Sequence, residues 1–297
     1  MSAAHTDVER LEARLRRHVQ ELAGTIGDRN VFRPQALEDA ARYISCDLDA
    51  SGFQPSSQPF TALGREVRNI EAELTGTERA DEIVVLGAHY DSVEGCPGAN
   101  DNGSGVAALL EVARALKAFS VERTVRFVAF VNEEPPFFQG PQMGSLVSAR
   151  RSRARGERIV GMLSLETIGY YTNEPKTQQY PAPLGLLYPS TGNFIGMVGN
   201  VRSRQLLTRV ATAFRAATAF PIQSAVAPAS LPGVGWSDHW AYWQEGYPAI
   251  MLTDTAPYRY PHYHTAHDTP DKLQYPQFAQ VVAGVIDATR TLARADR

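Results

Sequence analysis

The sequence is poor in cysteine, has no long apolar run and carries little excess charge. Its 297 residues include 2 cysteines, and the formal net charge is -3. Cys46 and Cys96 form neither a C-x-x-C motif nor a disulfide framework, so we expect two free thiols. No apolar stretch approaches the ~20 residues that a transmembrane helix needs, and the charge gives no reason to expect nucleic acid as a partner. With 43% hydrophobic and 21% charged residues, an ordinary globular chain remains.

The composition is uniform along the chain. No repeat, low-complexity tract or linker divides it, and we predict one domain over residues 1–297. Residues 1–15 are polar and helix-like and have no apolar core of the kind a signal peptide needs, so we expect a cytoplasmic protein with no membrane partner. The arginine-rich run at 150–155 is interpreted as a solvated helix end rather than an anion site.

Apolar residues recur with helical and strand spacing in alternating segments, which predicts an α/β fold. Helices are predicted at residues 8–22, 37–48, 104–117, 206–214 and 281–292, with a short one at 237–243. Strands are predicted at residues 69–74, 83–88, 125–131, 159–165 and 249–253. The unbroken runs 83–88, 125–131 and 159–165 are typical of strands buried on both faces, whereas 69–74 alternates like an antiparallel edge strand. Residues 170–200 show no periodicity and are predicted to form a lid or rim.

Ionisable side chains follow three of these strands. They are His89, Asp91, Glu133, Glu134 and Glu166. Taken alone, a His-X-Asp pair is more commonly a surface pair, and two adjacent acids are more commonly solvated carboxylates. Their position at strand ends favours a site instead, because open α/β sheets keep their chemistry at the carboxyl ends of the strands.

Two loops supply further donor side chains. Asp101 lies in a Gly-rich loop before a predicted helix, and a late loop carries His262, His264 and His267. Imidazoles and carboxylates without thiolates suit zinc or a similar divalent ion in a catalytic setting. Two metals about 3.5–4 Å apart need a bridging carboxylate and further ligands, which this set can provide. His262 and His267 are interpreted as polar loop residues.

Seven segments, taken in order, resemble the M28 family of co-catalytic zinc aminopeptidases. They are GAHYDS, GANDNGSG, FVNEEPP, MGS, LSLETIG, WSDHWAYW and YHTAHDTPDKL. The resemblance spans roughly residues 67–275, and several motifs in the same order make it more specific than any one of them. It implies a single α/β domain of the zinc-exopeptidase, phosphorylase/hydrolase-like type. The central β-sheet is then mixed, mainly parallel and flanked by helices.

The resemblance also implies a ligand set for two Zn²⁺ or similar divalent ions. His89 and Glu166 are then ligands of one ion, and Glu134 and His264 are ligands of the other. Asp101 is the bridge, and the peptide bond that follows it is cis. The family usually has Asp where this sequence has Glu166, and the extra methylene could alter the spacing or identity of the metals.

Other residues acquire roles next to these ligands. Glu133 becomes the general base for a metal-bridging water that attacks a peptide carbonyl, and Tyr263 could donate to the oxyanion. Asp91 becomes the carboxylate that orients the His89 imidazole from the side away from the metal. Asp238 and His239 are placed behind the ligands or on the wall of the substrate site.

These roles imply a di-zinc metallopeptidase that acts on a peptide or small amide, most simply an aminopeptidase that releases N-terminal residues. A glutaminyl-cyclase-like aminoacyltransferase with one zinc, and a specialised amidase or dipeptidase, remain as alternatives. A non-catalytic binding module is a third class, but such a protein should have lost ligands. Metal stoichiometry, and the product formed from an N-terminal glutaminyl peptide, discriminate the di-zinc peptidase from the one-zinc cyclase.

Overall fold

A computed structural model describes residues 3–182 and 184–294, which fold around one eight-stranded sheet in the order β1-β2-β4-β3-β5-β8-β6-β7. The strands are β1 Ser56–Ala62, β2 Arg65–Leu74, β3 Arg79–His89, β4 Arg123–Phe130, β5 Arg158–Glu166, β6 Ile195–Gly199, β7 Ile222–Val226 and β8 Ala249–Thr253. The central strands β4, β3, β5 and β8 are parallel. The β1–β2 hairpin adds to β4 antiparallel, and β6, paired parallel with β7, adds to β8 antiparallel. The expected mixed, mainly parallel α/β sheet is confirmed.

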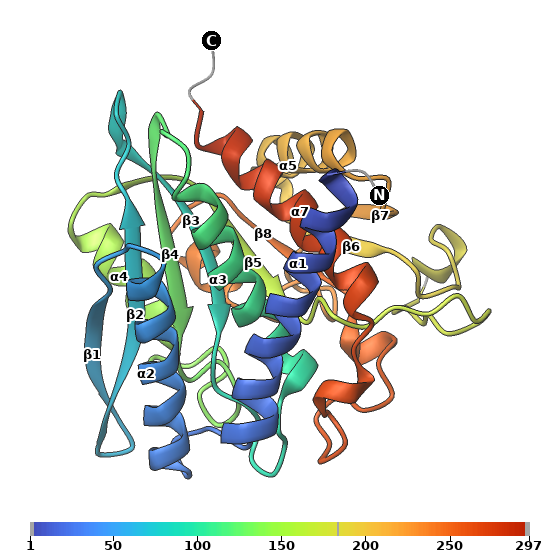
Figure 1. Ribbon diagram of the computed structural model, residues 1–297, viewed down its shortest axis with the longest axis horizontal. Helices are drawn as coiled ribbons and strands as arrows, with labels where there is room; N and C mark the ends of the chain where they lie inside the picture. The colour runs from blue at the N-terminus through green and yellow to red at the C-terminus, as the bar shows by residue number, and fades with distance from the viewer. Residues whose placement is uncertain (1–2, 183, 295–297) are drawn as a thin grey trace.

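Helices cover both faces of this sheet (Figure 1). One face carries α1 Ala3–Val19, α2 Pro34–Ala50, α3 Gly105–Leu116, α5 Arg204–Ala217 and α7 Tyr275–Leu292. The opposite face carries α4 Gly144–Ala154 and α6 His239–Gln244. Short helical turns complete the chain, namely η1 Gln20–Ile26, η2 Ala99–Ser104, η3 Leu184–Leu186, η4 Val201–Ser203, η5 Ala256–Tyr258 and η6 Pro270–Lys272.

The central strands are buried on both sides, which explains their unbroken apolar sequences. In β3, Val84 and Leu86 pack into the larger core beneath α1, α3 and α7, whereas Ile83 and Val85 pack into the smaller core beneath α4 and α6. Successive side chains of a strand point to opposite faces, so a strand between two helical layers needs apolar residues at every position. This packing fixes where the strand ends lie relative to one another.

Three strands have no counterpart in the sequence prediction. Residues 195–199 were expected to lie within an irregular segment, and that expectation is wrong because they form β6. β1, with the sequence SSQPFTA, is largely polar and contains a proline, and it is held as the edge strand by pairing with β2. β7 is only five residues long and half-buried. Short strands of this kind are specified by their neighbours more than by their own residues.

The described helices include none that combines the length and the apolar character needed to cross a membrane. Cys46 and Cys96 are both free, as expected, and Cys96 is buried. The arginine-rich run lies at the C-terminal end of α4, where Arg150 pairs with Glu245 at 3.6 Å, so the interpretation as a helix end is confirmed. A cytoplasmic location stays a prediction.

Candidate metal centre

The carboxyl ends of three adjacent parallel strands meet at one edge of the sheet. His89 is the last residue of β3 and lies opposite Phe130, the last residue of β4. Glu133 and Glu134 lie three and four residues after the end of β4, and Glu166 is the last residue of β5. Because β3 lies between β4 and β5, all of these acids converge on His89. The structure therefore brings the strand-end residues together as the sequence predicts.

Asp101 lies between two separate pairs of donor side chains. Its Oδ1 is 3.3 Å from Nε2 of His89, which is in turn 3.3 Å from Oε2 of Glu166. Its Oδ2 is 3.0 Å from Nε2 of His264, which is 3.4 Å from Oε2 of Glu134. Each oxygen of one carboxylate thus faces a different His–Glu pair.

Two of the groups that could hold a metal ion share Asp101. In one group the ligand atoms belong to His89, Asp101 and Glu166, in the other to Asp101, Glu134 and His264, and the atoms of each group lie within 4.8 Å of one another. Two ligands of one tetrahedral zinc, each about 2.0–2.1 Å from the ion, lie about 3.3 Å apart. The separations around Asp101 match that value.

Unpartnered buried atoms point to the same conclusion. Nε2 of His89, Oδ1 of Asp101 and Oε1 of Glu134 are buried and have no hydrogen-bond partner among the described residues. Buried polar atoms are normally satisfied, and an ion that the structure does not include is one explanation for exceptions. The donor set is imidazole and carboxylate only, which fits Zn²⁺ or a similar divalent ion.

His89 and the Glu133–Glu134 pair are both held by Asp91. Nδ1 of His89 donates to the main-chain oxygen of Asp91 at 3.2 Å, and the Asp91 carboxylate lies 3.6 Å from the same nitrogen. In the neutral ring this bond places the hydrogen on Nδ1 and leaves the electron pair of Nε2 for a metal. The Asp91 carboxylate also accepts hydrogen bonds from the main-chain amides of Glu133 at 3.1 Å and Glu134 at 3.2 Å.

The crowding of acids changes how these side chains titrate. Burial raises the pKa of Glu134 to about 8, with Asp101 adding to the rise and His264 opposing it. Burial also raises the pKa of Glu133 well above its ordinary value, against the opposing charge of His89. For His264 burial acts the other way, but hydrogen bonds to Asp101 and Glu134 raise its pKa to about 10. The site thus favours positive charge, as expected of a cation site.

Main-chain contacts fix the position of Asp101. The Asp268 carboxylate accepts hydrogen bonds from the main-chain amides of Asn100 at 2.9 Å and Asp101 at 3.1 Å. The Asn102 side chain donates to the main-chain oxygen of Leu165 at 2.8 Å, which ties the turn to β5. The peptide bond between Asp101 and Asn102 is cis, as expected. The sequence reasoning assigned no role to Asp268, although it lies only four residues after His264.

The Ser237–Asp238–His239 segment lies behind the site. Ser237 donates to Oε2 of Glu166 at 2.8 Å, a contact that the sequence reasoning missed although this serine is part of the WSDHWAYW motif. Both oxygens of Asp238 are buried without a hydrogen-bond partner in the described part of the chain, and burial raises its pKa to about 7. Burial lowers the pKa of His239 to about 4, and its Nε2 bonds the main-chain oxygen of Val234 at 2.8 Å. His239 therefore supports a loop.

A mainly apolar cavity of about 290 Å³ opens beside Glu166 and Tyr263. Tyr263 stacks on His264 with ring centroids 3.8 Å apart. Residues of β6, β7 and the segments around them form the walls, among them Tyr180, Leu184, Tyr188, Met197, Val226, Val234, Trp236 and Met251. Residues 170–194 thus contribute one wall of this cavity, which the sequence alone could only locate as a lid or rim.

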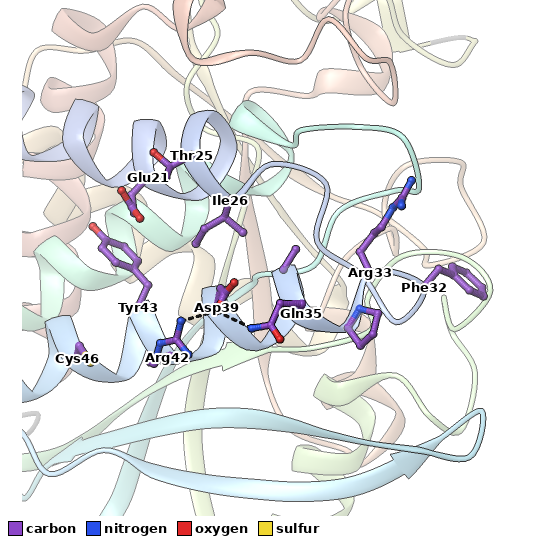
Figure 2. A pocket seen from close by; sticks show the side chains of 12 residues that line it. Glu21, Thr25, Ile26, Phe32, Arg33, Gln35, Asp39, Arg42, Tyr43 and Cys46 are labelled. Carbon is purple, nitrogen blue, oxygen red and sulfur yellow. Dashed lines mark hydrogen bonds and ion pairs between the residues drawn. The ribbon is translucent and has the colours of Figure 1, made fainter.

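A second hollow, of about 830 Å³, lies on the surface between η1 and α2, as Figure 2 shows. Asp39, one of the residues that line it, is bonded to Gln35 at 3.0 Å and paired with Arg42. The residues that line it come from the N-terminal helices and the segment between them, away from the cluster of imidazoles and carboxylates at the strand ends. The smaller cavity next to Glu166 and Tyr263 is therefore the better candidate for a substrate site, although the surface hollow is larger.

Comparison with known sequences identifies relatives. The model of peptidase family M28 matches residues 69–289. The uncharacterized protein YfbL of Escherichia coli K12 is 39% identical over 292 residues, which cover 95% of this chain and 87% of that protein. Leupeptin-inactivating enzyme 1 of Streptomyces exfoliatus is 29% identical over 198 residues, and the match covers 63% of this chain and 45% of that enzyme.

Solved structures share the fold over nearly the whole chain. The aminopeptidase from Aneurinibacillus sp. strain AM-1 superposes with a TM-score of 0.74 at 18% identity, covering 99% of this chain and 97% of that one. The glutaminyl cyclase of Fimbriiglobus ruber superposes with a TM-score of 0.74 at 20% identity, covering 94% and 95%. The same architecture thus occurs in structures with two different names, and the fold alone does not select between them.

Proposed function

Because this chain belongs to peptidase family M28, we propose that it is a zinc-dependent exopeptidase that holds two divalent ions and releases N-terminal residues from peptides. The observation that carries the proposal is the position of Asp101, whose two oxygens face two different His–Glu pairs at 3.3 Å and 3.0 Å. A bridging carboxylate of this kind is what a pair of ions about 3.5–4 Å apart requires.

The assignment of ligands follows from the two groups that share Asp101. His89 and Glu166 would hold one ion, Glu134 and His264 the other, and Asp101 both. When bound, such ions supply Lewis acidity, which polarises a substrate carbonyl and acidifies water. Glu166 would serve as a ligand although it is one methylene longer than Asp. Its carboxylate lies 3.3 Å from His89 and accepts a hydrogen bond from Ser237.

Glu133 is the candidate proton acceptor. Its carboxylate lies 3.9 Å from Nε2 of His89, farther than the carboxylates of Asp101 and Glu166, and only 5% of the residue is exposed. It therefore borders the site without being needed as a ligand. In the proposed reaction Glu133 accepts the proton of the attacking water and returns it to the leaving amine.

Tyr263 is the candidate donor to the developing oxyanion. Burial and the neighbouring carboxylates, Asp101 first among them, raise the pKa of its phenol, so the hydroxyl keeps its proton. The residue also lines the apolar cavity. A neutral phenol between the cavity and the metal residues could donate to a carbonyl oxygen as charge develops on it.

The net charge of the site favours action at the N-terminus of a peptide. The acids there are Asp91, Asp101, Glu133, Glu134, Glu166 and Asp238. Bound cations would favour the ionised forms of these carboxylates, against the effect of burial, and two divalent ions would then balance four of the six charges. Within the described residues, the ion pairs of Asp101, Glu133, Glu134 and Glu166 are with His89 or His264. A site with this surplus of negative charge attracts a protonated α-amine and repels a C-terminal carboxylate.

The cavity beside Glu166 supports an apolar residue at the N-terminus of the substrate. Its volume of about 290 Å³ lies at the lower end of the ~300–1,000 Å³ range of small-molecule pockets. It can therefore take one side chain rather than a folded peptide. Burying a large apolar side chain contributes about 1.5–3 kcal/mol, so peptides and amides that begin with such a residue are the preferred substrate class.

Metal titration tests the proposal directly. Protein stripped by a chelator should take up two equivalents of zinc and then hydrolyse leucine amide but not N-acetyl-leucine amide. Asp101→Asn should lose both ions, because it removes the shared charge. Asp47→Asn, at a carboxylate that pairs with Arg114 at 2.9 Å on the outer side of the helices, is the control and should bind two. Full uptake by Asp101→Asn would contradict the bridging role.

Glutaminyl cyclisation is the alternative that the fold leaves open, given the cyclase neighbour. A one-zinc cyclase should take up a single equivalent and convert an N-terminal glutaminyl peptide to pyroglutamyl peptide without releasing glutamine. Release of free glutamine by the two-zinc protein supports the exopeptidase. A plateau at one equivalent, together with pyroglutamyl product, would replace the proposal with the cyclase.

A further inference from the structure

Arg29 is a fully buried cation that the sequence pattern gave no reason to single out. It lies between η1 and α2, outside residues 69–289 that match the family model, and its exposed fraction is 0%. Its guanidinium donates to five main-chain oxygens. They belong to Tyr90 at 2.7 Å, Leu22 at 3.2 Å, Gly27 at 3.2 Å, Pro97 at 2.5 Å and Gly98 at 2.9 Å. Nε and Nη2 make one bond each, and the two hydrogens of Nη1 are shared among three oxygens, so every nitrogen of the guanidinium is engaged.

Three of these acceptors belong to the loop that joins two candidate metal ligands. Residues 90–98 connect His89 at the end of β3 with Asp101 in η2. The main chain of Arg29 is bonded to the same loop, because the Ser92 amide donates to the Arg29 oxygen at 2.9 Å and the Arg29 amide donates to Oγ of Ser92 at 3.2 Å. Both ends of the loop are therefore bonded to one residue.

Gly98 permits the close approach of the guanidinium. Its φ is +66°, in the region where glycine is favoured. A Cβ added there would lie 2.5 Å from the main-chain oxygen of Asp101 and 3.3 Å from an amino group of Arg29. Loop, ligand and arginine are thus packed against one another with no room for a side chain.

No carboxylate forms an ion pair with Arg29 among the residues described. Burial lowers its pKa, and the negative charges of Asp268, Asp91 and Asp101 oppose that change. A buried charge without a contacting partner is expensive, because it gives up its hydration. Main-chain oxygens rather than a carboxylate replace that hydration, and three of the five belong to the 90–98 loop, so holding the loop is the evident use of this arginine.

Asp268 holds the other side of the same turn. Arg29 binds the main-chain oxygens of Pro97 and Gly98, and the Asp268 carboxylate binds the main-chain amides of Asn100 and Asp101. A buried cation on the carbonyl side and a buried anion on the amide side thus fix the segment from both ends. The position of Asp101 relative to His89 depends on this pair.

We propose that Arg29 is a positioning residue for the metal centre, which holds the 90–98 loop so that Asp101 faces both His–Glu pairs. This inference rests on the proposed two-ion site. It is distinct from a general contribution to folding, because the contacts of Arg29 lead to the bridging ligand itself. A longer or looser loop would leave the His–Glu pairs in place and move the carboxylate that they share.

Two substitutions of Arg29 separate its geometry from its charge. Arg29→Met removes all five donors, whereas Arg29→Lys keeps the charge and offers at most three donors without the planar fork. Arg126→Met is the matched control, because Arg126 is a buried arginine of β4 that pairs with Glu157 at 2.6 Å. Circular dichroism first establishes which proteins are folded without metal.

Zinc affinity, measured by competition with a chromophoric chelator, is the main readout. We expect Arg29→Met and Arg29→Lys to weaken zinc binding about 10–100-fold, the loss typical when groups behind metal ligands are removed. Arg126→Met should lower the melting temperature and leave both affinities within about 2-fold of the parent. If Arg29→Met does not fold, Arg29→Lys decides. A folded Arg29 variant with the affinity of the parent would overturn the proposal, as would equal losses in the Arg126 control.

Hydrogen exchange keeps this inference separable from the proposed function. The amides of Ser92 and Gly103 bond the oxygens of Arg29 and Gly98. In protein stripped of metal, we expect their exchange to quicken at least about 10-fold in the Arg29 variants and not in the Arg126 control. If the parent takes up fewer than two ions, the two-ion function fails whatever the exchange shows. If the parent takes up two and loop exchange is unchanged, the role of Arg29 fails alone.

Discussion

Replacing Glu133 by glutamine should stop turnover and leave the metal centre intact. The carboxylate of Glu133 is 3.9 Å from His89, whereas those of Asp101 and Glu166 are 3.3 Å from it. Its main-chain amide, not its carboxylate, makes the bond to Asp91. Glutamine keeps the shape and the main-chain contact and removes the basic oxygen. The ligand set should therefore bind both ions as before.

The expected loss follows from the isolation of this carboxylate. A positioned general base contributes about 10²–10⁴-fold to the rate, which is about 2.7–5.5 kcal/mol of activation free energy. Glu133 is only 5% exposed, so bulk water has little access to replace it as a proton acceptor. We therefore expect kcat to fall by about 10³-fold or more, with KM for leucine amide nearly unchanged, because Glu133 acts on the transition state.

The assay compares kcat, KM and bound zinc in the parent, Glu133→Gln and Glu111→Gln. Glu111 is an equally buried glutamate on α3, bonded to His18 at 3.0 Å and to Arg14 at 2.6 Å, and it controls for the loss of a buried carboxylate. Its variant should be less stable and, while folded, as active as the parent. Near-full activity of Glu133→Gln with two ions bound would refute the role of Glu133 as base. Loss of zinc from that variant would show instead that Glu133 is a ligand.

Substitutions at three further residues test other parts of the structure. Glu166→Gln should weaken at least one ion about 10-fold while Glu166→Asp stays active, and unchanged zinc affinity of Glu166→Gln would make this residue a bystander. Tyr188→Ala opens the cavity wall and should cut the preference for leucine amide over alanine amide about 10-fold in kcat/KM, whereas Tyr188→Phe, which loses only the 3.1 Å bond to the main-chain oxygen of Ser224, should keep it. Equal preferences in these two variants would remove Tyr188 from the substrate site. Burial raises the pKa of Asp254 to about 7, so the folded state holds its proton more tightly than the unfolded chain and the protein should lose stability as pH rises from about 4 to about 7. Asp254→Asn should lose less stability between pH 5 and pH 8 in urea unfolding, by up to about 2.7 kcal/mol, which is about two pH units below the folded pKa. Parallel losses in both proteins would contradict the assignment.

Local patterns determined the central part of the fold. The segments 83–88, 125–131 and 159–165 are apolar at every position, and each is a central parallel strand with a helical layer on either side. The edge strands were not predictable in this way. β1 has the sequence SSQPFTA, and β6 and β7 have five residues each, so their extended conformation depends on the neighbour that supplies hydrogen bonds.

In the candidate metal centre, too, some features follow from local sequence and others depend on tertiary contacts. Strand order places the ends of β3, β4 and β5 at one edge, so a sequence that ends these strands in His89, Glu134 and Glu166 already predicts a cluster of metal-ligand side chains. The distances that place Asp101 between the two His–Glu pairs depend on contacts between residues far apart in the chain. Asp268 lies 167 residues from Asp101, to whose main-chain amide it is bonded.

Arg29 marks the limit of what sequence alone can provide. In the printed sequence it is one charged residue in a polar turn, which ordinarily means exposure to solvent. Only the packing of η1 and α2 against the 90–98 loop buries it, and burial in turn directs its donors to the oxygens of Pro97 and Gly98. Side-chain chemistry and strand order are encoded locally and can be read in the sequence. The partner of a buried charge is chosen by the fold as a whole, because it depends on which surfaces exclude water together.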